Sequence, residues 1–158
     1  MFGNNAREKK ETFDKKMREI SRSQAAFEAD DVASSGARII EAYLKAVYSL
    51  SAKDLPMNRM GEEFFYDAQN LIRDRKKQGV SMTCSDAMVS SISLADYNSL
   101  AHYSVQSAVY DVMFKVKGAY ARGTIQNAYS ESRIGRFSFR NDYELGWILC
   151  GHKDMGSC

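Results

Sequence analysis

The hydrophobic pattern is most continuous between Ser93 and Gly123, where apolar residues recur at helical spacing. At about 100° per residue, apolar positions from Leu94 to Val116 fall on one broad face. From residue 80 to residue 114 the chain carries no Lys or Arg. A segment so poor in charge is expected to be buried on more than one side. The sequence therefore predicts a long central helix over about residues 93–122.

Three aromatic residues lie on nearly the opposite face of this predicted helix, namely Tyr103, Tyr110 and Phe114. The face of a helix that meets water is normally polar. These rings are therefore either covered by a second layer of the same fold or form a contact surface for another molecule. The sequence leaves both interpretations open.

Shorter patterns flank this segment on both sides. Amphipathic runs predict helices over about residues 6–28, 35–50, 54–77 and 85–92. After Gly123 apolar and polar residues alternate, as is typical of strands, and Asn141-Asp142 is an acceptable hairpin turn. In that hairpin Arg136 would face Trp147 on the neighbouring strand.

These elements predict an α+β fold that is predominantly α. It would be a helical bundle of roughly four to five helices around the long central helix, with a small C-terminal antiparallel β-hairpin. We expect a single domain over residues 1–158, with flexible ends at 1–5 and 151–158.

Composition narrows the class of protein. The 158 residues are 44% hydrophobic and 27% charged, which is ordinary for a globular chain, and the net charge of +2 does not require a nucleic-acid partner. No apolar stretch has the length needed to span a bilayer, and the first residues lack an apolar signal core. Three cysteines at no framework spacing predict free thiols. These features favour a cytoplasmic protein with no membrane contact.

One group of residues near the C-terminus contains side chains of the types that bind zinc, namely Cys150, His152 and Cys158. Structural zinc normally uses two ligand pairs at defined spacing, and only one cluster exists here. Cys150 and His152 could also form a nucleophile–base pair, although nothing in the sequence identifies an oxyanion site. We therefore expect no metal and no cofactor.

His102 is the other histidine of the chain. It could form an acid–base pair with Asp96 or Asp111. A lone helical histidine is more commonly satisfied by local hydrogen bonds. The sequence also lacks P-loop, Rossmann, HExxH, GxSxG and zinc-finger patterns, so it gives little support to an enzyme.

A basic and aromatic surface is predicted on one face of the hairpin, where it would contain Arg136, Arg140, Tyr143 and Trp147. Cations beside aromatic rings on an open sheet can hold phosphates and stack bases. The same side chains favour protein contacts. An internal cation–π pair between Arg136 and Trp147 would explain them as well.

Taken together, these features favour a small cytosolic macromolecule-binding protein: an adaptor, inhibitor, immunity-type or chaperone-type factor that acts by protein–protein contact without chemistry. The expected partner is another protein, and self-association into a homo-oligomer is a corollary. The alternatives are a nucleic-acid-binding regulator that uses the basic C-terminal third and, third, a small enzyme with an unrecognised site. The predicted partner-binding residues are Tyr103, Tyr110, Phe114, Arg136, Arg140, Tyr143 and Trp147.

Overall fold

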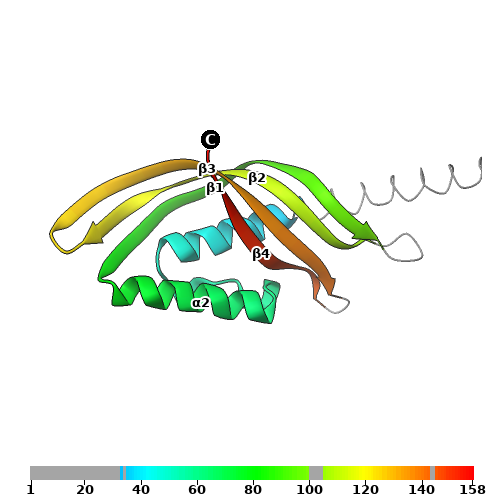
Figure 1. The fold of residues 1–158 in the computed structure, drawn as a ribbon, viewed down its shortest axis with the longest axis horizontal. Coiled ribbons are helices and arrows are strands. Elements are labelled where there is room, and N and C mark those ends of the chain that lie inside the picture. The colour runs from blue at the N-terminus through cyan, green and yellow to red at the C-terminus, as the bar shows by residue number, and fades with distance from the viewer. Residues whose placement is uncertain (1–32, 34, 100–104, 143–144) are drawn as a thin grey trace, which may run out of the picture.

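The computed structural model describes residues 33, 35–99, 105–142 and 145–158. A helix over residues 35–48 is followed by two 3-10 turns, η1 (Ala52–Asp54) and η2 (Met57–Arg59), and by helix α2 (Glu62–Lys77). Four antiparallel strands form one sheet in the order β1-β2-β3-β4 (Figure 1). Their bounds are β1 Val80–Ser99, β2 Val105–Arg122, β3 Ile125–Asp142 and β4 Gly146–Ser157.

The sheet arches over the 35–48 helix, and α2 lies on the far side of that helix (Figure 1). The concave face of the sheet supplies the largest buried rings, which are Tyr110, Phe114, Phe137 and Phe139. The helix inserts Ile40 and Leu44, both fully buried, against them. Burying side chains of this size stabilises a fold by about 1.5–3 kcal/mol each, so the core lies between the helix and the sheet.

Strand β1 explains the bend of the sheet. Ser85, Ser90 and Ala95 are each passed over in the pairing of β1 with β2, and each is therefore the extra residue of a β-bulge. Bulges bend a strand and increase its twist. The hydroxyls of Ser85 and Ser90 donate hydrogen bonds to the carbonyl oxygens of Lys117 and Met113 in β2, at 3.2 and 3.0 Å. Polar bulge residues are thus satisfied by the neighbouring strand.

The predicted helical bundle around a central helix over residues 93–122 is wrong. The described residues contain two α-helices, and most of these residues lie in strands. Residues 93–99 belong to β1 and residues 105–122 to β2, while the predicted helix over 85–92 is also part of β1. Tertiary burial of one face of a sheet has overridden a local pattern that suited a helix.

The bulges show why the pattern of β1 was misleading. Its residues on the concave side are spaced alternately by two and three positions, at Met82, Cys84, Ala87, Val89, Ile92, Leu94 and Tyr97. A regular strand has a period of two and a helix a period of 3.6. Each bulge adds one residue to the count, so the strand loses its simple alternation and approaches a helical spacing.

The C-terminal third forms strands, but in another register than the one predicted. Arg136 pairs with Lys153, and Trp147 pairs with Asn141. The connection between β3 and β4 is longer than the predicted two-residue turn, so Trp147 lies opposite a different residue. Residues 151–157, expected to be a flexible end, form the second half of β4. The predicted helix over residues 6–28 and the flexible end at 1–5 lie outside the described residues.

Candidate functional site

Two of the three aromatic residues predicted to contact a partner lie inside the fold. Tyr110 and Phe114 are each 2% exposed on the concave face of β2. Their rings pack edge-to-face against Phe139 and Phe137, with centroids 6.0 and 6.2 Å apart. Tyr103 lies outside the described residues. The structure thus places Tyr110 and Phe114 in the core rather than on a contact surface.

The predicted basic and aromatic surface is divided between the two faces of the sheet. Arg136 and Arg140 are exposed on the convex face, whereas Trp147 is half-buried and packs against the core on the concave side. Tyr143 lies outside the described residues. Because a shift of register by an odd number of residues moves side chains to the opposite face, the altered pairing separates Trp147 from the arginines.

The convex face has no aromatic side chain among its described residues, as judged from the alternation along the paired strands. Arg136 on this face is paired with Asp111, whose carboxylate accepts hydrogen bonds from its guanidinium at 2.8 and 3.2 Å. This hydrogen bonding lowers the pKa of the Asp111 carboxyl. The stacking platform that the nucleic-acid hypothesis needs is therefore not formed on the described convex surface.

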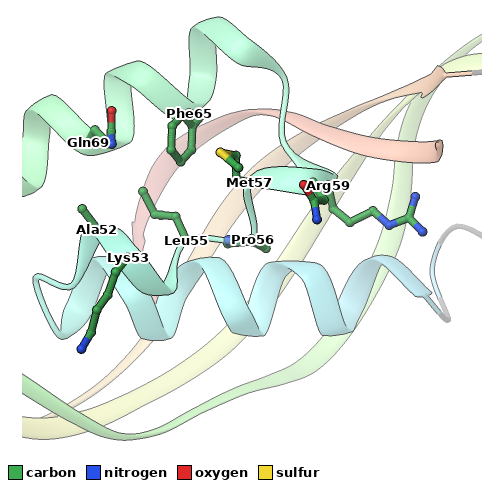
Figure 2. Close-up of a pocket in the computed structure, with 9 residues that line it drawn as sticks. Ala52, Lys53, Leu55, Pro56, Met57, Arg59, Phe65 and Gln69 are labelled. Atoms are coloured by element: carbon green, nitrogen blue, oxygen red, sulfur yellow. The ribbon is translucent and has the colours of Figure 1, made fainter. Parts of the chain in front are cut away.

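A groove lies at the corner where the chain passes from the 35–48 helix to α2 (Figure 2). Leu50 lies just beyond the end of the first helix and has a φ of 51°, and the amide of Ser51 donates to the carbonyl oxygen of Ala46 at 2.9 Å. This is the hydrogen bond of a Schellman-type helix end. The chain then turns back through η1 and η2 and enters α2, so residues of the turn face residues of α2.

We call this hollow the corner groove; its volume is about 630 Å³, and it is lined by Ala52, Lys53, Leu55, Pro56, Met57, Asn58, Arg59, Phe65 and Gln69. Figure 2 shows Leu55 and Met57 on one side facing Phe65 of α2 on the other. Leu55 is buried, whereas Met57 is 59% exposed. The groove therefore combines a strongly exposed apolar side chain with a buried apolar floor.

Two cations flank the apolar floor of the corner groove. Lys53 and Arg59 are exposed and extend away from each other at opposite ends of the groove (Figure 2). None of the residues that line the groove is acidic. Its charge and apolar floor therefore suit an apolar segment that carries carboxylates.

The imidazole of His152 in β4 is the other polar group that could take part in a site. The hydroxyl of Tyr43 is 3.1 Å from His152 Nδ1, and the imidazole is stacked on Phe137 with centroids 4.3 Å apart. His152 Nε2 is buried and has no hydrogen-bond partner among the described residues. A Cβ atom added at Gly135 would lie 2.9 Å from this nitrogen, so Nε2 points towards the backbone of β3.

The protonation of this region is unfavourable for nucleophilic chemistry. Burial lowers the pKa of His152, an effect that Asp154 opposes and Arg133 reinforces. Burial raises the pKa of the Cys150 thiol, which again favours the neutral form. Activated cysteines have a lowered pKa next to a cationic partner. The directions of both pKa shifts favour the neutral thiol and the neutral imidazole, unlike those of an activated thiolate.

Two further predicted sites, the metal site and the acid–base pair of His102, can be compared with the structure only within the described residues. Within the part of the chain that the structure describes, no three His, Cys, Asp or Glu side chains are grouped closely enough to hold a metal ion, and Cys84, Cys150 and Cys158 are free. His102 lies outside the described residues, and its proposed partner Asp111 is bound to Arg136.

The corner groove was not found by sequence reasoning. Met57 and Phe65 fit the apolar stripe of a helix, and Lys53 and Arg59 fit ordinary surface charges. A local signal exists, because Pro56 interrupts the helix pattern between two cations. It could indicate a turn, but not that the turn would fold back onto Phe65.

Comparison with known proteins gives a likeness of fold. No family model matches the sequence, and no curated protein matches it. The structure resembles the intermembrane space region of the chloroplast protein ARC6, with a TM-score of 0.55 and 11% identity over 79% of this chain and 97% of that one. A periplasmic fragment of TraM is also similar, with a TM-score of 0.49 and 13% identity over 82% of this chain and 98% of that one. CagV, a VirB8 homolog from Helicobacter pylori, has a TM-score of 0.43 and 12% identity over 77% of this chain and 98% of that one.

These comparisons contradict the expectation of a cytoplasmic location, because the similar ARC6 region belongs to an intermembrane space. Free thiols and an ordinary composition were only indirect indications of a compartment, because a domain that needs no disulfide can fold in either environment. None of the helices among the described residues combines the length and the apolar character that crossing a bilayer requires.

Proposed function

We propose that this protein is a non-enzymatic protein-binding domain whose corner groove receives an apolar segment of a partner with acidic flanking residues. The exposure of Met57 at 59%, above the buried Leu55, carries the proposal. A large exposed apolar side chain is stabilised when a partner covers it, by about 25 cal/mol for each Å² removed from water.

The flanking charges determine which partner fits. Lys53 and Arg59 stand at the two ends of the groove with no acidic residue lining it. Complementary charge increases the rate of association and excludes partners of the wrong sign. A partner segment with carboxylates on both sides of its apolar residues satisfies both ends.

The likeness to the ARC6 region concerns the fold and is consistent with a binding role. The protonated thiol of Cys150 and the buried imidazole of His152 favour binding over catalysis in the same way. Self-association is the competing explanation of an exposed groove, and light scattering distinguishes it from binding of another protein.

The test uses a photo-crosslinking amino acid at Asn58, which lines the groove. In lysate from the source organism, we expect a discrete crosslinked partner whose yield falls at least about tenfold with Met57→Asp, because a carboxylate opposes apolar contact. The matched control is Met113→Asp, which changes a methionine 40% exposed on the convex face and should leave the crosslink intact.

Replacement of Lys53 and Arg59 by glutamate should weaken the same contact and reduce its dependence on salt. The proposal fails if Met57→Asp leaves the crosslinked band unchanged while Met113→Asp removes it. It fails equally if the only product is a homodimer of this chain, since the groove would then be an interface between copies.

A further inference from the structure

Strand β4 forms one edge of the sheet, and the described residues pair only with the beginning of that edge. Met60 forms a parallel bridge with Leu149, and the amide of Gly61 donates to the carbonyl oxygen of Leu149 at 2.8 Å. Among the described residues, this is the single bridge on the outer side of β4. After Gly61 the chain enters α2 and leaves the edge. An uncovered edge strand is a template for pairing with another chain.

A cleft of about 480 Å³ begins where this covering ends, between β4 and α2. Cys150, Gly151 and His152 line it from the strand. Gly151 has no side chain, so its contribution to the wall is main chain, and it is half-buried there. An edge with exposed main chain beside a cleft is suited to an extended peptide rather than to a compact ligand.

The opposite wall of the cleft is acidic and apolar. Glu63 and Asp67 of α2 are exposed and line it, four residues apart and thus on one side of the helix. Phe64 and Leu71 supply apolar surface between and beyond them, with Leu71 41% exposed. No Lys or Arg lines the cleft. The charge is therefore opposite in sign to that of the corner groove, and the two sites suit different segments.

We propose that the cleft between α2 and β4 binds an extended basic segment of a partner protein, which adds to β4 as a strand beyond Leu149. Main-chain hydrogen bonds to the edge of β4 supply affinity. Lysine or arginine side chains on the face towards α2 pair with Glu63 and Asp67, and this supplies specificity. The pairing of Met60 with Leu149 defines where the added strand begins.

The probe is an acetylated and amidated seven-residue peptide of alternating lysine and valine, titrated into the full chain by calorimetry and by NMR. We expect the largest amide shifts at Gly151 and His152. The peptide with glutamate in place of lysine should bind at least about tenfold more weakly, because it faces two carboxylates.

Two N-methylated forms of the lysine–valine peptide test strand pairing itself. Methylation of the lysine nitrogens removes the donors from one edge of the peptide, and methylation of the valine nitrogens removes them from the other. We expect one form to lose binding and the other to retain it. Equal binding by both forms would show attraction of charge without strand addition and would overturn the proposal.

The variant Glu63→Lys with Asp67→Lys should bind the basic peptide at least about tenfold more weakly and the acidic peptide more tightly. Its matched control is Glu62→Lys with Asp74→Lys, which changes two exposed acids of α2 that do not line the cleft. The proposal would be overturned if the peptide caused amide shifts centred on the convex face. It would also be overturned if light scattering showed a dimer of this chain whose formation prevents the amide shift of Gly151. Its outcome is independent of the Met57 test of the corner groove.

Discussion

At the scale of single residues, Gly118 shows how closely β1 approaches β2. A Cβ atom at this position would collide with the carbonyl oxygen of Thr83 and lie 2.8 Å from the hydroxyl of Tyr129. That hydroxyl donates a hydrogen bond to the same carbonyl at 2.9 Å. Both neighbours are fixed by the strand backbone and by this hydrogen bond, so neither can move cheaply. Gly118 marks a close approach of main chains at the first bulge of β1.

We therefore predict that Gly118→Ala lowers the free energy of unfolding by about 1–3 kcal/mol or more. The measurement is urea denaturation followed by circular dichroism. Gly151→Ala is the matched control, because a Cβ there would make ordinary contacts of 3.5 Å with Ser138. Equal stability of the two variants would show that the approach of Thr83 is not rigid.

At the scale of elements, β1 is the other edge of the sheet, and the 35–48 helix protects part of it. The Glu41 carboxylate accepts a hydrogen bond from the amide of Val89 at 2.9 Å, next to the bulge at Ser90. Bulges and charged side chains are common means of preventing edge-to-edge pairing. The helix thus contributes an acceptor to a strand that, within the described part of the chain, has no paired strand on that side.

Replacement of Glu41 by alanine should lower the free energy of unfolding by about 1–3 kcal/mol, because it leaves the half-buried amide of Val89 unsatisfied. Hydrogen exchange at that amide should become faster than at neighbouring amides of β1. Glu41→Gln, which keeps an acceptor oxygen of the same shape, should lose clearly less stability and protection. Identical exchange in both variants would contradict the role of this hydrogen bond.

At the scale of the whole molecule, the stability of the fold should depend on pH through His152. Burial lowers the pKa of this imidazole in the folded chain, whereas in the unfolded chain it has the ordinary value of about 6.5. Below about pH 6.5 the unfolded chain therefore binds a proton that the folded chain does not bind. The loss of stability therefore grows as the pH falls below about 6.5, and it reaches a constant value once the folded imidazole is protonated too.

We expect the free energy of unfolding to fall between pH 7 and pH 5.5 with a slope of at most about 1.4 kcal/mol per pH unit. His152→Gln should flatten this slope. His102→Gln is the matched control because the chain has only these two histidines, and it should leave the slope in place. A slope that persists in the His152 variant would assign the titration to another group.

Much of the secondary structure near the helices follows from local pattern. The helix over 35–48 lies close to its predicted range, because it buries one face and its apolar residues repeat accordingly. The helix predicted over 54–77 begins only at Glu62, and the 3-10 turns η1 and η2 precede it. After Gly123 apolar and polar residues alternate, because one face of each strand is buried and the other is exposed. The alternation from Ala108 to Val116 was present as well, yet apolar residues on both parities made it equally compatible with a helix.

Local pattern was enough to predict the helix over 35–48, the greater part of α2, the extended character of the C-terminal third and the free thiols. Long-range contacts determined that residues 93–99 and 105–122 are strands, which side of the sheet Trp147 occupies, and where a groove and a cleft form. The physical reason is that a bulge or a register shift of one residue reverses the exposed face of a strand. Contacts with distant segments select the register, and no local pattern of residues records that choice.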